Sequence, residues 1–175
     1  YRNYFGATRN HNTITVNDMN QSSRGPRFLT IDWPEGYLEE FIINKDSVCF
    51  SGYHTAYGNL IHTRRIEYKA GRCVIMDEVQ NKSGQEIRIK LSWNIGTDIV
   101  SVGDNNYRLV ISNEETIDLE IFSSTFGRAH IYNGDEEVPA GWTSLYYGEK
   151  LPLNQLVYEV NSNKQREVLC TIILL

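Results

Sequence analysis

The sequence lacks the features that mark membrane, disordered and nucleic-acid-binding proteins. No run of about 18 apolar residues occurs, and the longest apolar stretch, Val168 to Leu175, is only as long as a strand. Hydrophobic residues make up 41% of the chain, which is typical of a folded domain. The formal net charge of −5 argues against a general nucleic-acid-binding function. We therefore expect neither nucleic acid nor a membrane among its partners.

The N-terminal segment differs in charge from the chain as a whole. Its charged residues include four arginines and two aspartates, namely Arg2, Arg9, Arg24, Arg27, Asp18 and Asp32. Solvated surface arginines are the ordinary explanation for such a group. Local patches can nevertheless override the total charge when an anionic ligand binds.

Markers of disulfide, zinc and hydrolase chemistry are also missing. The three cysteines are Cys49, Cys73 and Cys170. They lie in apolar runs without Cys-x-x-Cys spacing, and their odd number excludes a fully paired framework, so we interpret them as small core residues. The four histidines form no His-x-His, His-Glu-x-x-His or nucleophile-elbow motif. We expect His54 in a loop, and His62 and His130 in structural positions.

The length of the sequence and its lack of internal boundaries indicate a single domain. A chain of 175 residues can bury one core, and no internal repeat, low-complexity linker or interior boundary is visible. We expect one domain over residues 1–175. The chain starts at Tyr1 without an initiator methionine or a signal-peptide pattern, so we interpret it as a piece of a larger protein.

Strand patterns recur along almost the whole chain. Period-2 or short continuous apolar runs alternate with turn signals, whereas helix-period patterns are missing. The predicted strands are Asn12–Asn17, Arg27–Trp33, Tyr37–Lys45, Ser47–Gly52, Leu60–Lys69, Arg72–Gln80, Glu86–Ile95, Asp98–Val102, Tyr107–Ser112, Thr116–Phe122, Gly127–Tyr132, Thr143–Tyr147, Gln155–Val160 and Glu167–Leu174. Strands at this spacing predict an all-β fold, an antiparallel multi-stranded β-sandwich.

The segment Leu60–Gln80 is the clearest hairpin. Alternation along its first arm places His62 and Arg64 on the same face. Ala70-Gly71 supplies a two-residue turn, and Asp77 lies near the end of the return arm.

Four stretches, taken in order, resemble the heparinase II/III-like proteins. "YFGATRNHNTITVNDMNQ" is similar to a family segment built around Arg-x-His-Asn-Thr, and "IHTRRIEYKAGRCVIMDEV" resembles its His-x-Arg-Arg hairpin. "IKLSWNIGTD" is similar to its next strand, although the family often has a histidine at Trp93 or Asn94. "GWTSLYYGEKLPLNQLVYEV" resembles its closing segment. The resemblance extends from about Tyr4 to the C-terminus.

This resemblance implies an architecture and a reaction. Full-length members carry an N-terminal α/α toroid followed by an antiparallel sandwich of the lyase supersandwich type, and only the sandwich is present here. The implied reaction is β-elimination on uronic-acid-containing polysaccharides, such as heparin-like, alginate-like or bacterial surface polymers. The implied partners are an acidic polysaccharide and the toroid of the same chain. Most catalytic groups of the family lie before Tyr1, so we expect no catalytic residue in this piece and no activity of the piece alone.

The resemblance also assigns roles to individual residues. His11 matches a family histidine that is one ligand of a divalent metal, expected to be zinc, in the full-length protein only. One histidine cannot hold such an ion, because zinc needs about four ligands. Tyr4, Arg9 and Asn12 are the candidates for substrate binding, although surface or turn roles are the simpler explanation for each. One of Arg64 and Arg65 is expected to pair with a nearby acid such as Asp77 or Glu78, and neither is expected to be catalytic.

A second function class stays open at this point. The domain could be a carbohydrate-binding or purely structural module without chemistry, in a relative whose lyase site has decayed. By analogy with the family, the expected location is the bacterial periplasm, although three unpaired cysteines fit that compartment less well.

Overall fold

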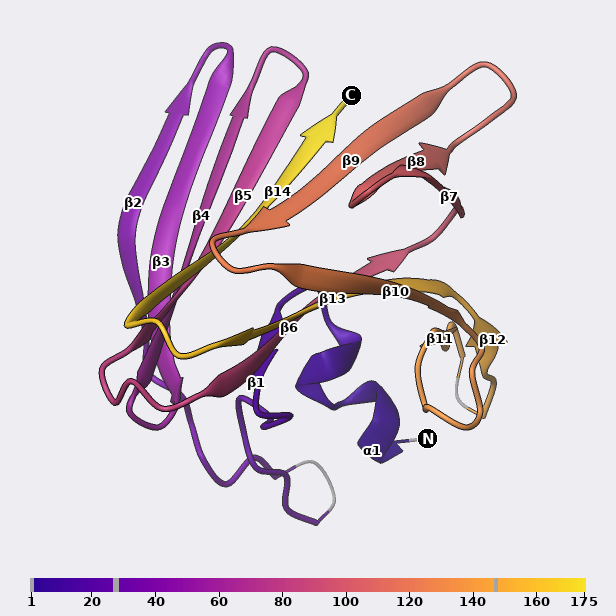
Figure 1. Cartoon of the computed structure of the whole chain (residues 1–175). Helices are drawn as coiled ribbons and strands as arrows, with labels where there is room; N and C mark the ends of the chain where they lie inside the picture. The colour runs from indigo at the N-terminus through magenta and orange to yellow at the C-terminus, as the bar shows by residue number, and fades with distance from the viewer. Residues whose placement is uncertain (1, 27–28, 147) are drawn as a thin grey trace.

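The computed structural model describes residues 2–26, 29–146 and 148–175, and strands dominate it (Figure 1). The helical pieces described are α1 (Arg2–Phe5) and the 3-10 turn η1 (Thr8–Asn10). The strands are β1 (Ile14–Val16), β2 (Gly36–Asn44), β3 (Ser47–Tyr57), β4 (Leu60–Lys69), β5 (Arg72–Asn81), β6 (Ile87–Ile95), β7 (Asp98–Gly103), β8 (Asn106–Val110), β9 (Thr116–Ser123), β10 (Gly127–Asn133), β11 (Trp142–Thr143), β12 (Leu151–Pro152), β13 (Asn154–Ser162) and β14 (Arg166–Leu174). Within the described ranges, no helix has the length and apolar character that a membrane crossing requires.

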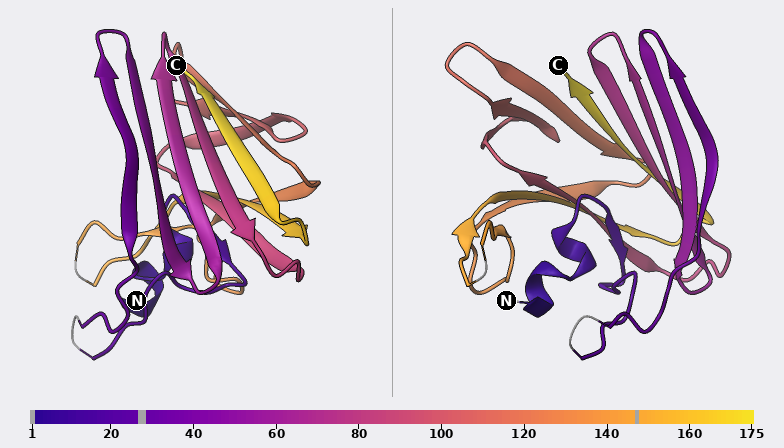
Figure 2. Two further views of the ribbon diagram at one scale, coloured as in Figure 1. Left: turned by 90° about the vertical axis from the view of Figure 1, so that its left-hand side faces the viewer. Right: turned by 180° about the vertical axis from the view of Figure 1, so that it is seen from behind.

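Two antiparallel sheets form the body of the molecule. The larger has the strand order β2-β3-β4-β5-β14-β9-β8-β7, and the smaller has the order β1-β6-β13-β10. Figure 2 shows from two further sides how the small sheet packs across one end of the curved large sheet. β11 and β12 pair separately. The predicted all-β antiparallel sandwich is therefore confirmed.

The core lies between the facing surfaces of the two sheets. Its fully buried members include Ile14, Ile89, Leu91, Leu156 and Val160 of the small sheet and Val79, Ile121 and Leu169 of the large sheet. Trp93 links the layers, because its indole nitrogen donates a hydrogen bond of 3.1 Å to Oγ1 of Thr171. Gly127 is required by close packing, since a Cβ there would lie 2.4 Å from the ring of Tyr158. Burial of these side chains is the main stabilising force of the fold.

The predicted hairpin is present with the expected turn. Lys69 pairs with Arg72, which leaves Ala70 and Gly71 as the two turn residues. Both have positive φ, 48° and 76°, as a type I′ hairpin turn requires. The turn thereby sets the register of β4 against β5 and brings Arg64 opposite Asp77.

The large sheet is irregular at both of its edges. On β2 the pairing with β3 shifts between Leu38 and Glu40. On β7 the pairing with β8 shifts between Ser101 and Gly103. Such bulges locally increase twist and interrupt the ladder.

Several predicted boundaries are wrong. The first strand begins only at Ile14, because the residues before it form α1 and η1, which are too short to show a helical period. The strand predicted over Arg27–Trp33 is also wrong. The described residues 29–33 belong to no strand and take part in one isolated bridge, between Arg24 and Thr30, and Arg27 and Phe28 lie outside the described residues. The strand predicted over 143–147 is Trp142–Thr143 in the structure, and Tyr147 is also not described.

The cysteines are partly as predicted. All three are free thiols. Cys170 is buried in the core, whereas Cys49 and Cys73 are only partly buried. Burial raises the pKa of Cys170 and Cys73 above the usual thiol value, so both favour the protonated form.

Candidate functional site

The N-terminal segment lies against the outer face of the small sheet, on the side away from the large sheet (Figure 1). Asn12 fixes it there, because its Oδ1 accepts hydrogen bonds from the backbone N–H and the side-chain amide of Asn94, at 2.8 and 3.1 Å. The Asn94 amide also donates to the carbonyl of Asn10, and the Gln155 amide donates to the carbonyl of Arg9. Asn12 therefore joins the segment to β6. Its expected contact with substrate stays a prediction.

His11 lies at the end of η1 with its side chain exposed. Its backbone N–H donates to the carbonyl of Thr8 at 3.0 Å and closes the 3-10 turn. The described residues contain no group of three or more His, Cys, Asp or Glu side chains that could hold a metal ion. The donor set within the described chain thus does not make a zinc site around His11 by itself.

Tyr4 and Arg9 stand side by side at the same end. The guanidinium carbon of Arg9 lies 5.7 Å from the centre of the Tyr4 ring, within the range of a cation–π contact. The Tyr4 hydroxyl is buried near the backbone of Trp142 and has no hydrogen bond of good geometry among the described residues. Burial raises the pKa of Tyr4 above its usual value, so the phenol is protonated at neutral pH.

Arg64 and Asp77 form a buried ion pair in the hairpin. Nε and Nη2 of Arg64 donate to the two oxygens of Asp77 at 2.7 and 2.9 Å, a bidentate geometry. Burial alone would raise the pKa of Asp77, but the hydrogen bonds from His62 and Arg64 outweigh it and the pKa is lowered. The prediction that an arginine of this motif pairs with Asp77 is confirmed.

His54 was expected in a loop, and this was wrong. β3 continues to Tyr57, so His54 is a strand residue and stands opposite His62 in the neighbouring strand. The sequence carried a usable signal, because both histidines lie close to the Gly58-Asn59 turn on opposite arms of a hairpin. A predicted strand that continued past Gly52 would have placed His54 and His62 opposite each other on the two arms of the hairpin.

The two histidines and Asp77 form one directional chain of hydrogen bonds. The N–H of Ala56 donates to Nδ1 of His54 at 3.2 Å, so the proton of this neutral ring is on Nε2. Nε2 of His54 donates to Nδ1 of His62 at 2.9 Å, and Nε2 of His62 donates to Oδ1 of Asp77 at 2.7 Å. Burial is the main cause that lowers the pKa of His54 to about 4, and the nearby His62 and Arg64 act in the same direction. The His54 ring is therefore neutral at pH 7.

Residues at both ends of this chain of hydrogen bonds contact the N-terminal motif. Arg64 donates from Nη1 to the carbonyl of Asn12 at 2.5 Å. At the other end, the side-chain amide nitrogen of Gln21 lies 3.1 Å from Nε2 of His54 and close to the Tyr57 hydroxyl; since both this nitrogen and Nε2 carry protons, the approach to His54 is a packing contact and not a further hydrogen bond of the chain. That hydroxyl donates to the carbonyl of Ile14. Sequence reasoning missed Gln21, for which no local pattern gives a signal.

A hollow of about 360 Å³ adjoins this network. Gly52 helps to shape it, because a Cβ there would lie 2.9 Å from the carbonyl oxygen of Tyr37. Leu38 and Phe50 supply apolar walls, and His54 and Arg64 supply polar groups. Its chemistry is that of a small neutral pocket, since Asp77 balances the charge of Arg64.

Comparison with known proteins places these features in one family. The family model described as "Heparinase II/III-like, C-terminal" matches residues 1–170. The chain belongs to the heparinase II/III-like family. It is thus a domain of a polysaccharide lyase family, as its four motifs indicated.

Solved structures agree on the fold of this heparinase II/III-like domain. A heparinase III structure matches with a TM-score of 0.78 and 20% identity, covering 99% of this chain and 24% of that one. The heparan sulfate lyase HepC from Pedobacter heparinus matches with a TM-score of 0.79 and 14% identity, covering 99% of this chain and 25% of that one. The chain therefore spans about a quarter of the length of these structures. The search of curated proteins found no significant match.

Proposed function

We propose that this domain is the C-terminal sandwich of a polysaccharide lyase that cleaves uronic-acid-containing polysaccharides by β-elimination. The observation that carries the proposal is the match of the family model over residues 1–170. The structure adds a physical basis, because Arg64 of the second motif holds the backbone of Asn12 in the first. The two motifs are thereby parts of one assembly.

The chemistry of elimination sets what the whole protein must supply. Removal of the C5 proton of a uronate places negative charge on its carboxylate, so the enzyme must neutralise that group, provide a base and protonate the leaving oxygen. We assign most of these groups to a preceding domain of the same chain, expected to be an α/α toroid. Within this domain, Arg9 is an exposed cation that could meet substrate, while the ring of Tyr4 supports its guanidinium and the Tyr4 hydroxyl itself is buried.

His11 is proposed as one ligand of a divalent metal, zinc by expectation, in the whole protein. Its exposed imidazole leaves it accessible to further ligands from outside the described residues. When bound, such an ion would organise the segment that carries His11. By the same analogy we place the protein in the bacterial periplasm.

The direct test uses the whole protein that contains this domain. It is incubated with heparan sulfate, with alginate and with other acidic polysaccharides, and the ultraviolet absorbance of the unsaturated uronate is followed. A rise on one of these polymers supports the lyase. A well-folded protein that binds a uronate polymer without any rise would instead be the carbohydrate-binding module that was the alternative.

Metal content provides a separate readout for His11. We expect His11→Ala to lower the zinc content per protein molecule, measured by mass spectrometry after dialysis. His130→Ala, which removes another exposed histidine, is the matched control for metal content. Equal zinc in the His11 variant and the unmodified protein would remove the ligand role.

A further inference from the structure

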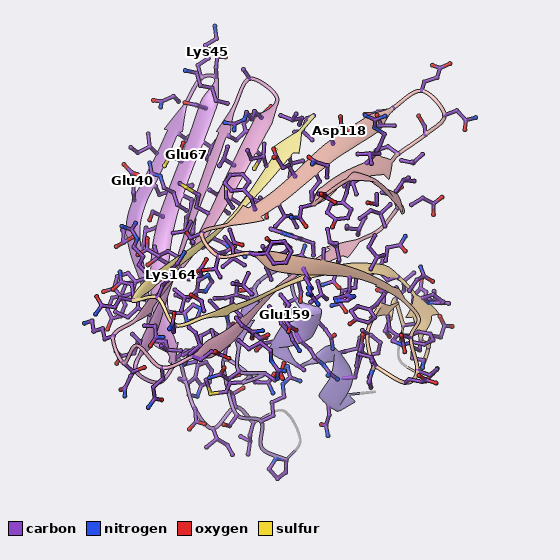
Figure 3. The ribbon with its side chains drawn as sticks, in the orientation of Figure 1. Glu40, Lys45, Glu67, Asp118, Glu159 and Lys164 are labelled. Atoms are coloured by element: carbon purple, nitrogen blue, oxygen red, sulfur yellow. The ribbon has the colours of Figure 1, made fainter. Side chains whose placement is uncertain are left out.

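The outer face of the small sheet carries a row of charged side chains across three strands. In the strand register, Lys90 of β6 stands opposite Glu159 of β13, and Glu159 stands opposite Arg128 of β10. The three side chains therefore point to the same side of the sheet. The adjoining residues of β6 and β13 on the opposite face, such as Leu91 and Tyr158, are in the core. Figure 3 labels Glu159 on the side of the small sheet where α1 lies. The row therefore faces outward.

η1 covers only part of this face. The carbonyls of Asn10 and Arg9 accept hydrogen bonds from Asn94 and Gln155, so η1 lies over the row of the sheet that contains these two residues. The rows that contain Lys90 and Arg88 lie further along the strands, and the Arg88 and Arg128 side chains are exposed. The open part contains the rows of Arg88 and Lys90, which lie two residues, or roughly 7 Å, apart along β6, whereas Ser92 in the next row is buried.

This face has an excess of positive charge on an acidic chain. Its cations are Arg9, Arg88, Lys90 and Arg128, and its carboxylates are Asp18 and Glu159. The chain as a whole carries −5. Four cations against two carboxylates therefore concentrate positive potential where the rest of the surface is negative.

Two of the cations are not neutralised by a neighbouring acid. Asp18 pairs with both Arg88 and Lys90, and Lys90 also lies 3.6 Å from Glu159. Among the described residues, no carboxylate lies within ion-pair distance of Arg9 or Arg128. A ligand that carries carboxylates would meet these two guanidinium groups without first breaking an ion pair.

A hollow of about 90 Å³ lies between Arg9, Lys90 and the loop that follows β10, and Arg128 is outside its lining. Its polar lining consists of Arg9, Lys90, His130, Tyr132, Gln155, Ser92 and the two carboxylates Asp18 and Glu159. The hollow is far below the 300–1,000 Å³ of pockets that enclose a whole ligand. Because Asp18 and Glu159 line it, the hollow itself disfavours an anion, and a ligand carboxylate would instead meet the exposed guanidinium groups of Arg9 and Arg128.

We propose that the outer face of the small sheet is a binding surface for a polyanionic saccharide, whose carboxylates are held by Arg9, Lys90 and Arg128. The inference rests on the proposed function and locates the acidic polymer on this domain. One carboxylate of the polymer meets Arg9 and another meets Arg128, and the next sugars extend along the sheet toward Arg88. The contacts are exposed ion pairs, so they give modest affinity that depends on salt.

Binding of fluorescently labelled alginate to the whole protein tests the proposal. We compare Arg9→Gln/Lys90→Gln/Arg128→Gln with the unmodified protein by fluorescence anisotropy at low and moderate ionic strength. The affinity should fall by roughly tenfold in the triple variant, and its dependence on salt should become weaker. Because loss of Lys90 leaves Asp18 and Glu159 uncompensated, Arg9→Gln/Arg128→Gln is measured as well, with an expected fall of about threefold to fivefold.

The matched control removes the same number of charges elsewhere. Lys45→Gln/Arg108→Gln/Arg166→Gln lies on the large sheet and its hairpins, and it should leave the affinity close to that of the unmodified protein. Alginate whose carboxylates have been reduced to hydroxymethyl groups should bind the unmodified protein poorly. Thermal unfolding of every variant separates lost binding from lost folding.

The outcomes distinguish this proposal from the proposed function. Equal losses in the two triple variants, equal binding of the reduced polymer, or no binding by the unmodified protein would each overturn the binding surface. If the Arg9→Gln/Arg128→Gln variant keeps full lyase activity and an unchanged affinity, the proposed binding surface is overturned and the lyase proposal stands. Loss of affinity in that variant, without any elimination by the unmodified protein, would keep the surface and end the lyase proposal.

Discussion

Arg64 donates a hydrogen bond of 2.5 Å to the backbone carbonyl of Asn12, a residue 52 positions earlier in the chain. The same guanidinium is held by the fully buried carboxylate of Asp77. The hairpin thus fixes the position of the Arg64 guanidinium, and this group in turn holds the segment that carries His11. The two most recognisable motifs of the sequence are in direct contact.

The Arg64–Asp77 pair should be essential for stability. Arg64→Ala leaves the buried Asp77 charge without its bidentate partner, and loss of one partner of a buried pair typically costs about 3–5 kcal/mol. We expect a loss of this order in the free energy of unfolding, measured by urea denaturation. Arg108→Ala is the matched control, since its pair with Asp118 is exposed and should contribute about 0–1 kcal/mol. Similar losses in both variants would contradict this account.

Stability should decline in mild acid because of His54. Its pKa is lowered from 6.5 to about 4 in the folded protein, so between these values the unfolded chain binds a proton that the folded chain does not. The contribution is therefore complete above pH 6.5 and is lost as the pH falls toward 4. After allowance for partial exposure, we expect about 1–2 kcal/mol over this window. The lowered pKa of Asp77 acts in the same direction at still lower pH.

Urea unfolding at several pH values measures this effect. The variant His54→Gln removes the titrating group and should flatten the pH dependence between 6.5 and 4. The exposed His130→Gln serves as the comparison and should retain the slope of the unmodified protein. An unchanged slope in the His54 variant would assign the acid sensitivity to other groups.

Gly141 should tolerate no side chain. Its φ is +72°, and a Cβ would lie 2.8 Å from the backbone carbonyl of Tyr132, which cannot move aside as a flexible side chain can. Gly141→Ala should therefore lower the melting temperature by several degrees, corresponding to about 2–4 kcal/mol. Gly58, with φ of +67° and no atom within 4 Å, isolates the conformational cost, so Gly58→Ala should lose only about 1 kcal/mol. Equal losses would mean that contact with Tyr132 is irrelevant.

Glu167 should be intolerant even of an isosteric change. Its buried carboxylate accepts hydrogen bonds from the N–H and hydroxyl of Thr125 and from the hydroxyl of Ser162. Glu167→Gln replaces one acceptor oxygen by an amide donor that faces these donors, which should cost about 1–3 kcal/mol in denaturant unfolding. The exposed Glu120→Gln should change stability by less than about 0.5 kcal/mol.

Much of the fold could be predicted because local signals decided it. Alternation gave most strands within a residue or two, and Ala70-Gly71 gave both a turn type and a register. The N-terminal helical pieces could not be found, since four and three residues cover about one turn each and show no period.

The site was less predictable because its partners are distant in sequence. The pairing of an arginine with Asp77 followed from two adjacent arms of a hairpin, which strand alternation reveals. The contacts of Gln21 with His54 and of Asn12 with Asn94 join residues 33 and 82 positions apart. Such contacts form only when the N-terminal segment packs against both sheets, against β6 at Asn94 and against β3 at His54.

The bulges on β2 and β7 bear on how the molecule behaves at high concentration. An edge strand offers unpaired N–H and C=O groups to other molecules, and β2 also exposes Phe41, Ile42 and Ile43. A kinked ladder at Leu38 and Glu40 twists this border away from the straight geometry that intermolecular strand addition requires. The same irregularities that interrupt hydrogen bonding within the large sheet thus guard the molecule against self-association and fibre growth.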